Sequence, residues 1–170
     1  MQRSLRMTGA LDPRGAWSAD RCTIARALEV VGTRSAFLLL REAFYGTARF
    51  DDFVRRAQLS PPVTSERLAA LVDAGLLERE GYREPGQRAR RQYRLTEKGA
   101  ELFPALAALM RWGDRWLDED GGPVALRHRG CGERVGVELR CAAGHRVQPG
   151  EIDLARNPDA PARRDRASAT

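Results

Sequence analysis

The sequence predicts a mainly α fold with a small β wing, an α+β architecture in which two helices are followed by a two-stranded hairpin. Two amphipathic, helix-sized segments, ARFDDFVRRAQ from Ala48 and SPPVTSERLAALVDAG from Ser60, lie on either side of a short polar break. Two β-like runs follow, LLEREGYRE and RRQYRL, joined by an arginine-rich loop that contains glycine. Helix, turn, helix and wing in this order are typical of a DNA-binding module, the winged helix-turn-helix.

The bulk composition is that of a globular protein with one well-cored domain and appendages, in a chain of 170 residues. Hydrophobic residues make up 42% and charged residues 31%, and no apolar run approaches the ~20 residues that span a bilayer. No apolar signal-like segment follows the start. Three cysteines, an odd number, argue against a disulfide framework and fit the cytoplasm. The net charge of +6 favours a polyanionic partner.

The first two predicted helices precede the DNA-binding pair. Ile24, Leu28 and Val31 recur at i, i+4 and i+7, which predicts a helix with one buried stripe that ends at Gly32. Ser35–Phe44 is apolar on most sides, so we expect it to be the central buried helix.

The third and fourth helices form the helix-turn-helix. The third spans Arg49–Ala57, and its apolar face comprises Phe50, Phe53, Val54 and Ala57. Ser60 can cap the fourth helix, Pro61 suits its first position, and Gly75 stops it. The inward stripe of the fourth helix, one turn after Thr64, consists of Leu68, Leu71 and Val72.

A hairpin and a long terminal helix complete the predicted domain. Strands Leu76–Glu84 and Arg90–Leu95 pair across the loop Pro85–Ala89. The terminal helix, Glu97–Leu117, has more apolar surface than a small domain needs, so we expect a partner subunit to cover it. The expected dimer interface consists of Leu102, Leu106, Leu109 and Trp116.

The predicted domain boundaries follow changes in composition. Residues 1–20 form an N-terminal arm, and 21–120 form the DNA-binding and dimerisation domain. After a Gly-Gly-Pro break, residues 123–156 suggest short strands with glycine turns, a small β ribbon that carries cysteine and histidine. Residues 157–170 are rich in proline, alanine and charge, which predicts a disordered tail.

The candidate DNA-binding residues lie in two places. The N-terminal end of a helix that enters a major groove needs small or polar residues that reach phosphates and base edges, and here it carries Ser60, Pro62, Ser65, Glu66 and Arg67. Between Arg83 and Arg94 there are five arginines and one acid, Glu84. The residues of this basic wing that we expect to bind phosphate are Gln87, Arg88, Arg90 and Arg91. The alternative for the helix is an ordinary solvated face.

Specific motifs between Cys22 and Leu117 make the chain resemble the HxlR-type winged-helix regulators of the MarR-like superfamily. These motifs are LLLREAFYG, ARFDDF, SERLAALVDAGLLER, YRLTEKG and WGDRWL. The resemblance implies a homodimer formed through the terminal helices. The family usually has proline where this chain has Thr23, and tryptophan where it has Ser35. The second change either opens space for a small molecule or is filled by Phe37 and Phe44.

Cys22 has two interpretations. Some members of the resembled family use the matching cysteine as a thiol switch for electrophiles, quinones or oxidants. Arg21 and the start of a helix both favour the reactive thiolate. In the alternative interpretation Cys22 is a small buried residue, which is common for unpaired cysteine.

The predicted ribbon carries four residues at metal-ligand spacing. His128-x2-Cys131 and Cys141-x3-His145 both suit a tetrahedral zinc site, so zinc is a candidate cofactor, although none is required for the predicted function. The alternative is a degenerate ribbon that has lost its metal and depends on strand pairing.

Taken together, the sequence predicts a DNA-binding transcriptional regulator and no enzyme. No Ser–His–acid arrangement stands out, and the glycines of GCGERVG lack the strand-to-helix context of a phosphate loop. We expect a homodimeric cytoplasmic repressor that binds an inverted-repeat operator in double-stranded DNA and needs no membrane, with a small molecule or a thiol-reactive signal as the candidate effector. The alternative function is a dimerisation or protein-interaction module that does not bind DNA.

Overall fold

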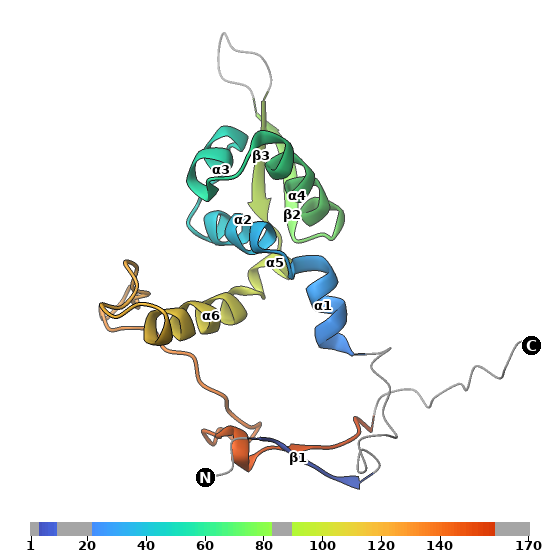
Figure 1. Ribbon diagram of the computed structural model, residues 1–170, viewed down its shortest axis with the longest axis vertical. Coiled ribbons are helices and arrows are strands. Elements are labelled where there is room, and N and C mark those ends of the chain that lie inside the picture. Colours follow the sequence, from blue (N-terminus) through green and yellow to red (C-terminus); the bar gives the residue numbers. More distant parts are fainter. Residues whose placement is uncertain (1–3, 10–21, 83–89, 159–170) are drawn as a thin grey trace, which may run out of the picture. The chain divides into compact units, whose positions relative to one another are not determined.

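The computed structural model describes residues 4–9, 22–82 and 90–158. The chain divides into two compact units, Cys22–Val137 and a smaller unit made of Met1–Arg21 and Glu138–Thr170. The larger unit contains these elements (Figure 1): α1 Thr23–Val31, α2 Arg34–Phe44, α3 Phe50–Ala57, α4 Pro61–Asp73, β2 Leu77–Tyr82, β3 Arg90–Leu95, α5 Glu97–Ala100 and α6 Phe103–Trp116.

The core of the larger unit lies where α2, α3 and α4 pack against one another and against the β2–β3 hairpin (Figure 1). The side chains that are completely or almost completely buried there include Leu39, Leu40, Phe53, Leu68, Leu71 and Leu77. These residues come from the helix predicted to be apolar on most sides, from the apolar faces predicted for the third and fourth helices, and from the first wing strand. The mainly helical winged helix-turn-helix architecture is therefore confirmed.

Charge placement and a left-handed residue define α3. Asp51 and Asp52 lie in its first turn and Arg55 and Arg56 in its last, so each pair faces the helix-dipole end of opposite sign. Gln58 ends the helix in the left-handed conformation with φ of 54°.

The start of α4 differs from the prediction in one respect. Ser60 occupies the N-cap position and Pro61 the first helical position, as expected, but the Ser60 side chain accepts no capping hydrogen bond. A capping oxygen accepts from the N–H of the second or third helical residue. The second residue is Pro62, which has no N–H, so this capping arrangement loses one of its two donors.

The wing is an antiparallel ladder that runs from the Leu77–Leu95 pair to the Tyr82–Arg90 pair. The segment before α3 pairs with the edge of β3 that faces away from β2. Tyr93 donates its N–H to the Ala48 carbonyl at 2.8 Å, and Arg49 forms an isolated β-bridge with Gln92. The wing is thus fixed to the beginning of α3 as well as to the end of α4.

The predicted terminal helix is interrupted. Instead of one helix over Glu97–Leu117, a single turn, α5, is followed by a break at Glu101 and Leu102, and α6 begins at Phe103. Proline disrupts a helix interior because it lacks an N–H and its ring meets the carbonyl four residues earlier. Pro104 is tolerated because the break makes it the second residue of a new helix.

The stripe predicted to be buried on α1 is not buried within the chain. Val31 is buried, but the Ile24 and Leu28 side chains are 70% and 54% exposed. The hydrophobic pattern predicted the helix correctly, but the prediction that its whole apolar stripe is buried was wrong. Only the last turn of α1 packs against the core.

In the smaller unit, a strand near the start of the sequence pairs with a strand near its end. Strand β1, Arg6–Met7, pairs in parallel with β4, Asp153–Leu154, and the Arg6 guanidinium makes two hydrogen bonds of 2.8 Å to the Asp153 carboxylate. A short 3-10 helix, Pro149–Glu151, precedes β4. The predicted arm therefore contributes a strand, whereas most of the predicted disordered tail, 159–170, lies outside the described residues.

Two tight turns lie within the region for which short strands with glycine turns are predicted. One is closed by the Arg127–Arg134 bridge and the other by the Arg140–Arg146 bridge. Each turn contains a glycine with positive φ, 75° at Gly132 and 83° at Gly144. The first turn belongs to the larger unit and the second to the smaller one, so the predicted 123–156 appendage is divided between the two units.

Candidate DNA-binding interface

The N-terminal half of α4 presents a polar surface opposite a buried one. Thr64, Leu68 and Leu71 are buried against the core. Four of the five residues predicted to contact DNA there are exposed, namely Ser60, Pro62, Ser65 and Glu66. Arg67 is half-buried. The amphipathic division that anchors α4 therefore leaves its polar face open to a ligand.

Side chains dominate this end of α4, because the backbone offers few donors. Pro61 and Pro62 have no N–H, and the Thr64 N–H is already bonded to the Ser60 carbonyl at 2.9 Å. Among the first four residues of the helix, only the Val63 N–H lacks a partner within the helix. Contacts from this end of α4 to phosphate would therefore come mainly from side chains.

The two charged residues on the exposed face of α4 contact each other. The Arg67 guanidinium lies 3.1 Å from the Glu66 carboxylate, and the Glu66 side chain is 69% exposed. An ion pair this exposed contributes little to stability, so it can open when either group meets a base edge or a phosphate.

The described part of the wing carries exposed arginines. Arg91 is exposed and lies opposite Gly81 in the ladder, on the same face of β3 as the buried Tyr93. Arg94 belongs to the opposite face and is paired with the Glu80 carboxylate at 2.8 Å. Among the predicted wing contacts, Gln87 and Arg88 lie outside the described residues, and of Arg90 the structure describes only the backbone as the first residue of β3.

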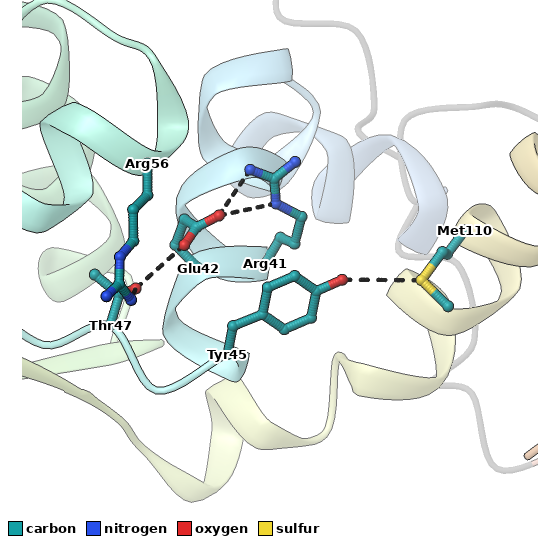
Figure 2. A network of polar contacts seen from close by, with 6 residues as sticks. All are labelled: Arg41, Glu42, Tyr45, Thr47, Arg56 and Met110. Carbon is teal, nitrogen blue, oxygen red and sulfur yellow. Dashed lines mark hydrogen bonds and ion pairs between the residues drawn. The ribbon is translucent and has the colours of Figure 1, made fainter. Parts of the chain in front are cut away.

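A buried polar network holds α3 in place, and sequence reasoning missed it. The Glu42 carboxylate on α2 is buried and accepts hydrogen bonds from Arg41, at 2.7 and 3.1 Å, and from the Thr47 hydroxyl, at 3.1 Å. The Thr47 oxygen in turn accepts from Arg56 of α3 at 2.9 Å (Figure 2). The network therefore links α2, the following turn and α3.

The same region of α2 also meets α6. Figure 2 shows Tyr45 directed towards Met110, with its hydroxyl 3.9 Å from the Met110 sulfur. The ring of Phe44, the residue before Tyr45, packs against that of Phe103 with centroids 5.0 Å apart. These contacts fix the beginning and middle of α6 to the domain.

The predicted dimer residues fall into two groups. Leu106 is buried, and Leu102 packs against the core of its own chain. Leu109 and Trp116 are exposed. Trp112 is exposed beside them, and sequence reasoning missed it although Leu109, Trp112 and Trp116 recur at i, i+3 and i+7.

Two further positions singled out in the sequence lie near helix starts. Cys22 is half-buried at the N-cap of α1 and is not in a disulfide. Ser35 lies in the first turn of α2, with its hydroxyl 3.3 Å from that of Thr33, the N-cap residue. Phe37 packs against the core and Phe44 against Phe103, so both rings have partners within the domain.

Part of the candidate metal set is close together. The His128 Nδ1 atom lies 3.2 Å from the Cys131 sulfur, and both residues are exposed. Within the smaller unit, the Cys141 N–H donates to the His145 carbonyl at 3.0 Å. In the described parts of the chain, no three His, Cys, Asp or Glu side chains form a group that could hold a metal ion. Zinc binding by the four residues remains a prediction.

Two comparisons extend the sequence resemblance. The family model described as HxlR-like helix-turn-helix matches residues 30–121, which include α2 to α6. An HTH-type transcriptional regulator of Mycobacterium tuberculosis that is described as uncharacterised is 44% identical over 120 residues, which are 70% of this chain and 75% of that relative. Within the described residues, no helix has the length and apolarity needed to cross a membrane.

Solved structures agree with this family. The crystal structure of PA1607, a candidate transcription factor, has a TM-score of 0.73 and 30% identity over 81% of this chain and 96% of its own. A redox regulator, HypR, in its oxidized form has a TM-score of 0.51 and 26% identity over 55% of this chain and 96% of its own. With the fold, the matched span and these relatives in agreement, the chain belongs to the HxlR-like helix-turn-helix family of transcriptional regulators, which are not enzymes.

Proposed function

We propose that this transcriptional regulator is a homodimeric repressor that binds an inverted-repeat operator in the cytoplasm. In each subunit α4 enters a major groove and the wing follows the adjacent phosphate backbone. The observation that carries this proposal is the division of α4 into a core-anchored face and an exposed face, with Ser65 and Glu66 on the exposed face. The exposed Arg91 on the wing also supports the proposal.

Exposed apolar side chains on two terminal helices support the dimer. Ile24 and Leu28 project from α1, and Leu109, Trp112 and Trp116 project from α6. Large apolar patches of this kind on a globular protein favour burial against another chain. A second copy of the chain fits an inverted repeat, because two-fold symmetry in the protein matches two-fold symmetry in the operator.

The first test is DNA selection from a random pool, followed by binding measurements with wing variants. We expect the selected DNA to contain two half-sites about 10 base pairs apart or a multiple of that spacing. Replacing Arg88, Arg90 and Arg91 by alanine should weaken binding to all sequences. Each lost phosphate contact should also reduce the slope of log affinity against log salt by ~0.9.

The matched control removes three exposed arginines from elsewhere, Arg129, Arg134 and Arg156. This control variant has the same net charge as the wing variant, so it should keep the wild-type salt slope if the contacts are local to the wing. Equal slopes of log affinity against log salt for wild type and wing variant would show that Arg88, Arg90 and Arg91 do not contact phosphate. A wild type that selects no DNA would favour a protein-interaction module.

We also propose a thiol-reactive signal that acts through Cys22. The similarity to a redox regulator and the half-buried position of Cys22 at the start of α1 support this second proposal. A quinone that adds to the thiol should release DNA from the wild type and leave the Cys22→Ser variant bound. A Cys131→Ser, Cys141→Ser double variant should respond like wild type. Equal release from the Cys22→Ser variant would rule out Cys22 as the sensor.

A further inference from the structure

The C-terminal end of α4 is enclosed by the segment that begins α5. Three consecutive carbonyls follow the helix, and each accepts a hydrogen bond from this segment. The Lys98 ammonium donates to the Ala74 carbonyl at 2.6 Å, and the Thr96 hydroxyl lies 2.7 Å from the Gly75 oxygen and 3.2 Å from the Leu76 oxygen. The Thr96 N–H also donates to the Leu76 carbonyl at 3.1 Å. We call Thr96, Lys98 and the carbonyls they bind the α4 clasp.

Close packing at the clasp leaves little freedom. Gly75 has φ of 71°, and the Leu76 N–H closes the helix end by donating to the Leu71 carbonyl at 2.9 Å. A Cβ atom added to Gly99, next to Lys98, would lie 2.1 Å from the Leu76 oxygen. A change in the bonds of the clasp therefore acts directly on the turn that joins α4 to β2.

Lys98 supplies the positive charge that α4 lacks. The last turn of α4 contains no basic residue, and a helix C-terminus carries a partial negative charge. The ammonium group of Lys98 lies against this end although it belongs to a different helix. Its hydrogen bond is charge-assisted, which makes it one of the stronger interactions at an exposed surface.

The identity of this residue is unusual in the chain. Lys98 is the single lysine among 29 basic residues, so the other 28 are arginines. It is also exposed. An arginine keeps its charge under cellular conditions, whereas a lysine loses its charge when its amine is acylated. Lys98 is consequently the one basic side chain in this sequence whose charge acylation can remove.

We propose that Lys98 is an acylation site and that its modification weakens DNA binding by releasing the C-terminal end of α4. The inference rests on the proposed function, because it requires α4 to be the recognition helix. Lys98 is a positioning residue in this scheme. Ala74 lies nine residues beyond Ser65, about 2.5 helical turns from the exposed DNA-binding end, so Lys98 acts on that end through the helix.

The co-reactant is an acyl phosphate such as acetyl phosphate. The deprotonated Lys98 amine attacks the carbonyl carbon, forming an N–C bond. The bond from that carbon to the phosphate oxygen breaks, and phosphate leaves with the electron pair. The nitrogen loses a second proton and becomes a neutral amide. No group is oxidised or reduced. The product has no positive charge at the C-terminal end of α4.

The test uses the full-length protein and the operator selected above. Wild type and Lys98→Arg are incubated with acetyl phosphate, and mass spectrometry locates the acetyl groups. The Lys98→Arg variant lacks the single lysine of the sequence and retains its other groups, so that variant is the matched control. Operator affinity is then measured as a function of salt, and the circular dichroism of each sample reports whether it is folded.

We expect acetylated wild type to be folded and to bind the operator roughly two- to fivefold more weakly, the range that corresponds to a typical helix-terminus charge interaction. The salt slope should not change, and acetyl phosphate should not alter the affinity of Lys98→Arg relative to the same variant without reagent. The uncharged variant Lys98→Gln should reproduce the loss without reagent. Unchanged affinity after stoichiometric acetylation of Lys98, or failure of the reagent to acetylate it, would overturn the proposal.

A salt slope lower by ~0.9 after acetylation would instead make Lys98 a direct phosphate contact and would overturn its positioning role. If untreated wild type binds no DNA, the proposed function itself is contradicted. If untreated wild type binds DNA and acetylation of Lys98 does not change its affinity, the acylation proposal alone is contradicted.

Discussion

Thr47 is a single side chain whose hydroxyl serves two neighbours. Its proton goes to the Glu42 carboxylate and its oxygen accepts from Arg56, while its backbone N–H donates to the Glu42 carbonyl at 2.9 Å. Because Thr47 and Glu42 are both buried, water cannot replace these bonds easily. The position of α3 therefore depends on one hydroxyl in the preceding turn.

Replacing Thr47 by valine, which has nearly the same shape, should lower the free energy of unfolding by about 1–3 kcal/mol. The buried Glu42 carboxylate loses one donor and Arg56 loses its acceptor, while the packing volume is conserved. Urea unfolding measures the change. Arg55→Ala is the control, because Arg55 also belongs to α3 and pairs with Asp52 at the exposed surface, where such pairs are worth ~1 kcal/mol or less. Equal stability of wild type and Thr47→Val would show that the network does not hold α3.

Among the smaller elements, strands β1 and β4 are short, and the Arg6–Asp153 ion pair links them beside their backbone hydrogen bonds. The hydrogen bond from Arg6 holds the pKa of Asp153 below its ordinary value. A carboxyl group with a lowered pKa in the folded state stabilises that state above its unfolded pKa, and the contribution is lost as pH falls through the lowered folded pKa. Acid should therefore separate the two strands.

The Thr8 amide reports this separation, because it donates to the Leu154 carbonyl at 2.9 Å across the pair. After correction for intrinsic exchange, its protection from hydrogen exchange should be constant from about pH 6 down to the ordinary carboxyl range near 4 and should fall below it. The Asp153→Asn variant should show weak protection throughout. A variant that retained the wild-type acid transition would place the titrating group elsewhere.

In the whole molecule, the exposed apolar face of α6 is the surface that we expect the second subunit of the proposed dimer to cover. The Leu109→Glu, Trp112→Glu double variant changes two exposed residues of α6 and should be folded and monomeric. Wild type should sediment as a dimer at micromolar concentration, and so should Val135→Glu, a control at an exposed valine outside α6. A monomeric wild type under these conditions would contradict the dimer.

Substitution of Leu106 should affect folding as well as dimerisation. Leu106 was predicted as an interface residue, but it is buried within its own chain. Leu106→Glu should therefore lower the midpoint of unfolding as well as any dimer affinity, because it places a charge in the domain interior. Exposed apolar residues such as Leu109 and Trp112 are therefore the better sites for a test of the proposed dimer, because their substitution leaves the domain interior intact.

The sequence by itself determined the order and type of the main elements and the face on which each DNA-binding helix is apolar. Leu68 and Leu71 are spaced so that any helix through them has one side to bury, and Ser65 and Glu66 then fall outside that side. The motifs from LLLREAFYG to WGDRWL were specific enough to indicate the family. These properties are local, so a single chain of residues contains them.

Only the tertiary structure decided which apolar residues are covered and which distant groups meet. The same helical spacing includes buried Leu106 and exposed Leu109, and it includes buried Val31 and exposed Ile24. No periodicity pairs Arg6 with Asp153 across 147 residues, or brings Lys98 to the Ala74 carbonyl. Periodicity fixes the direction in which a side chain leaves its own helix. Whether that side chain is buried, and which distant residue it contacts, depends on where the rest of the chain lies.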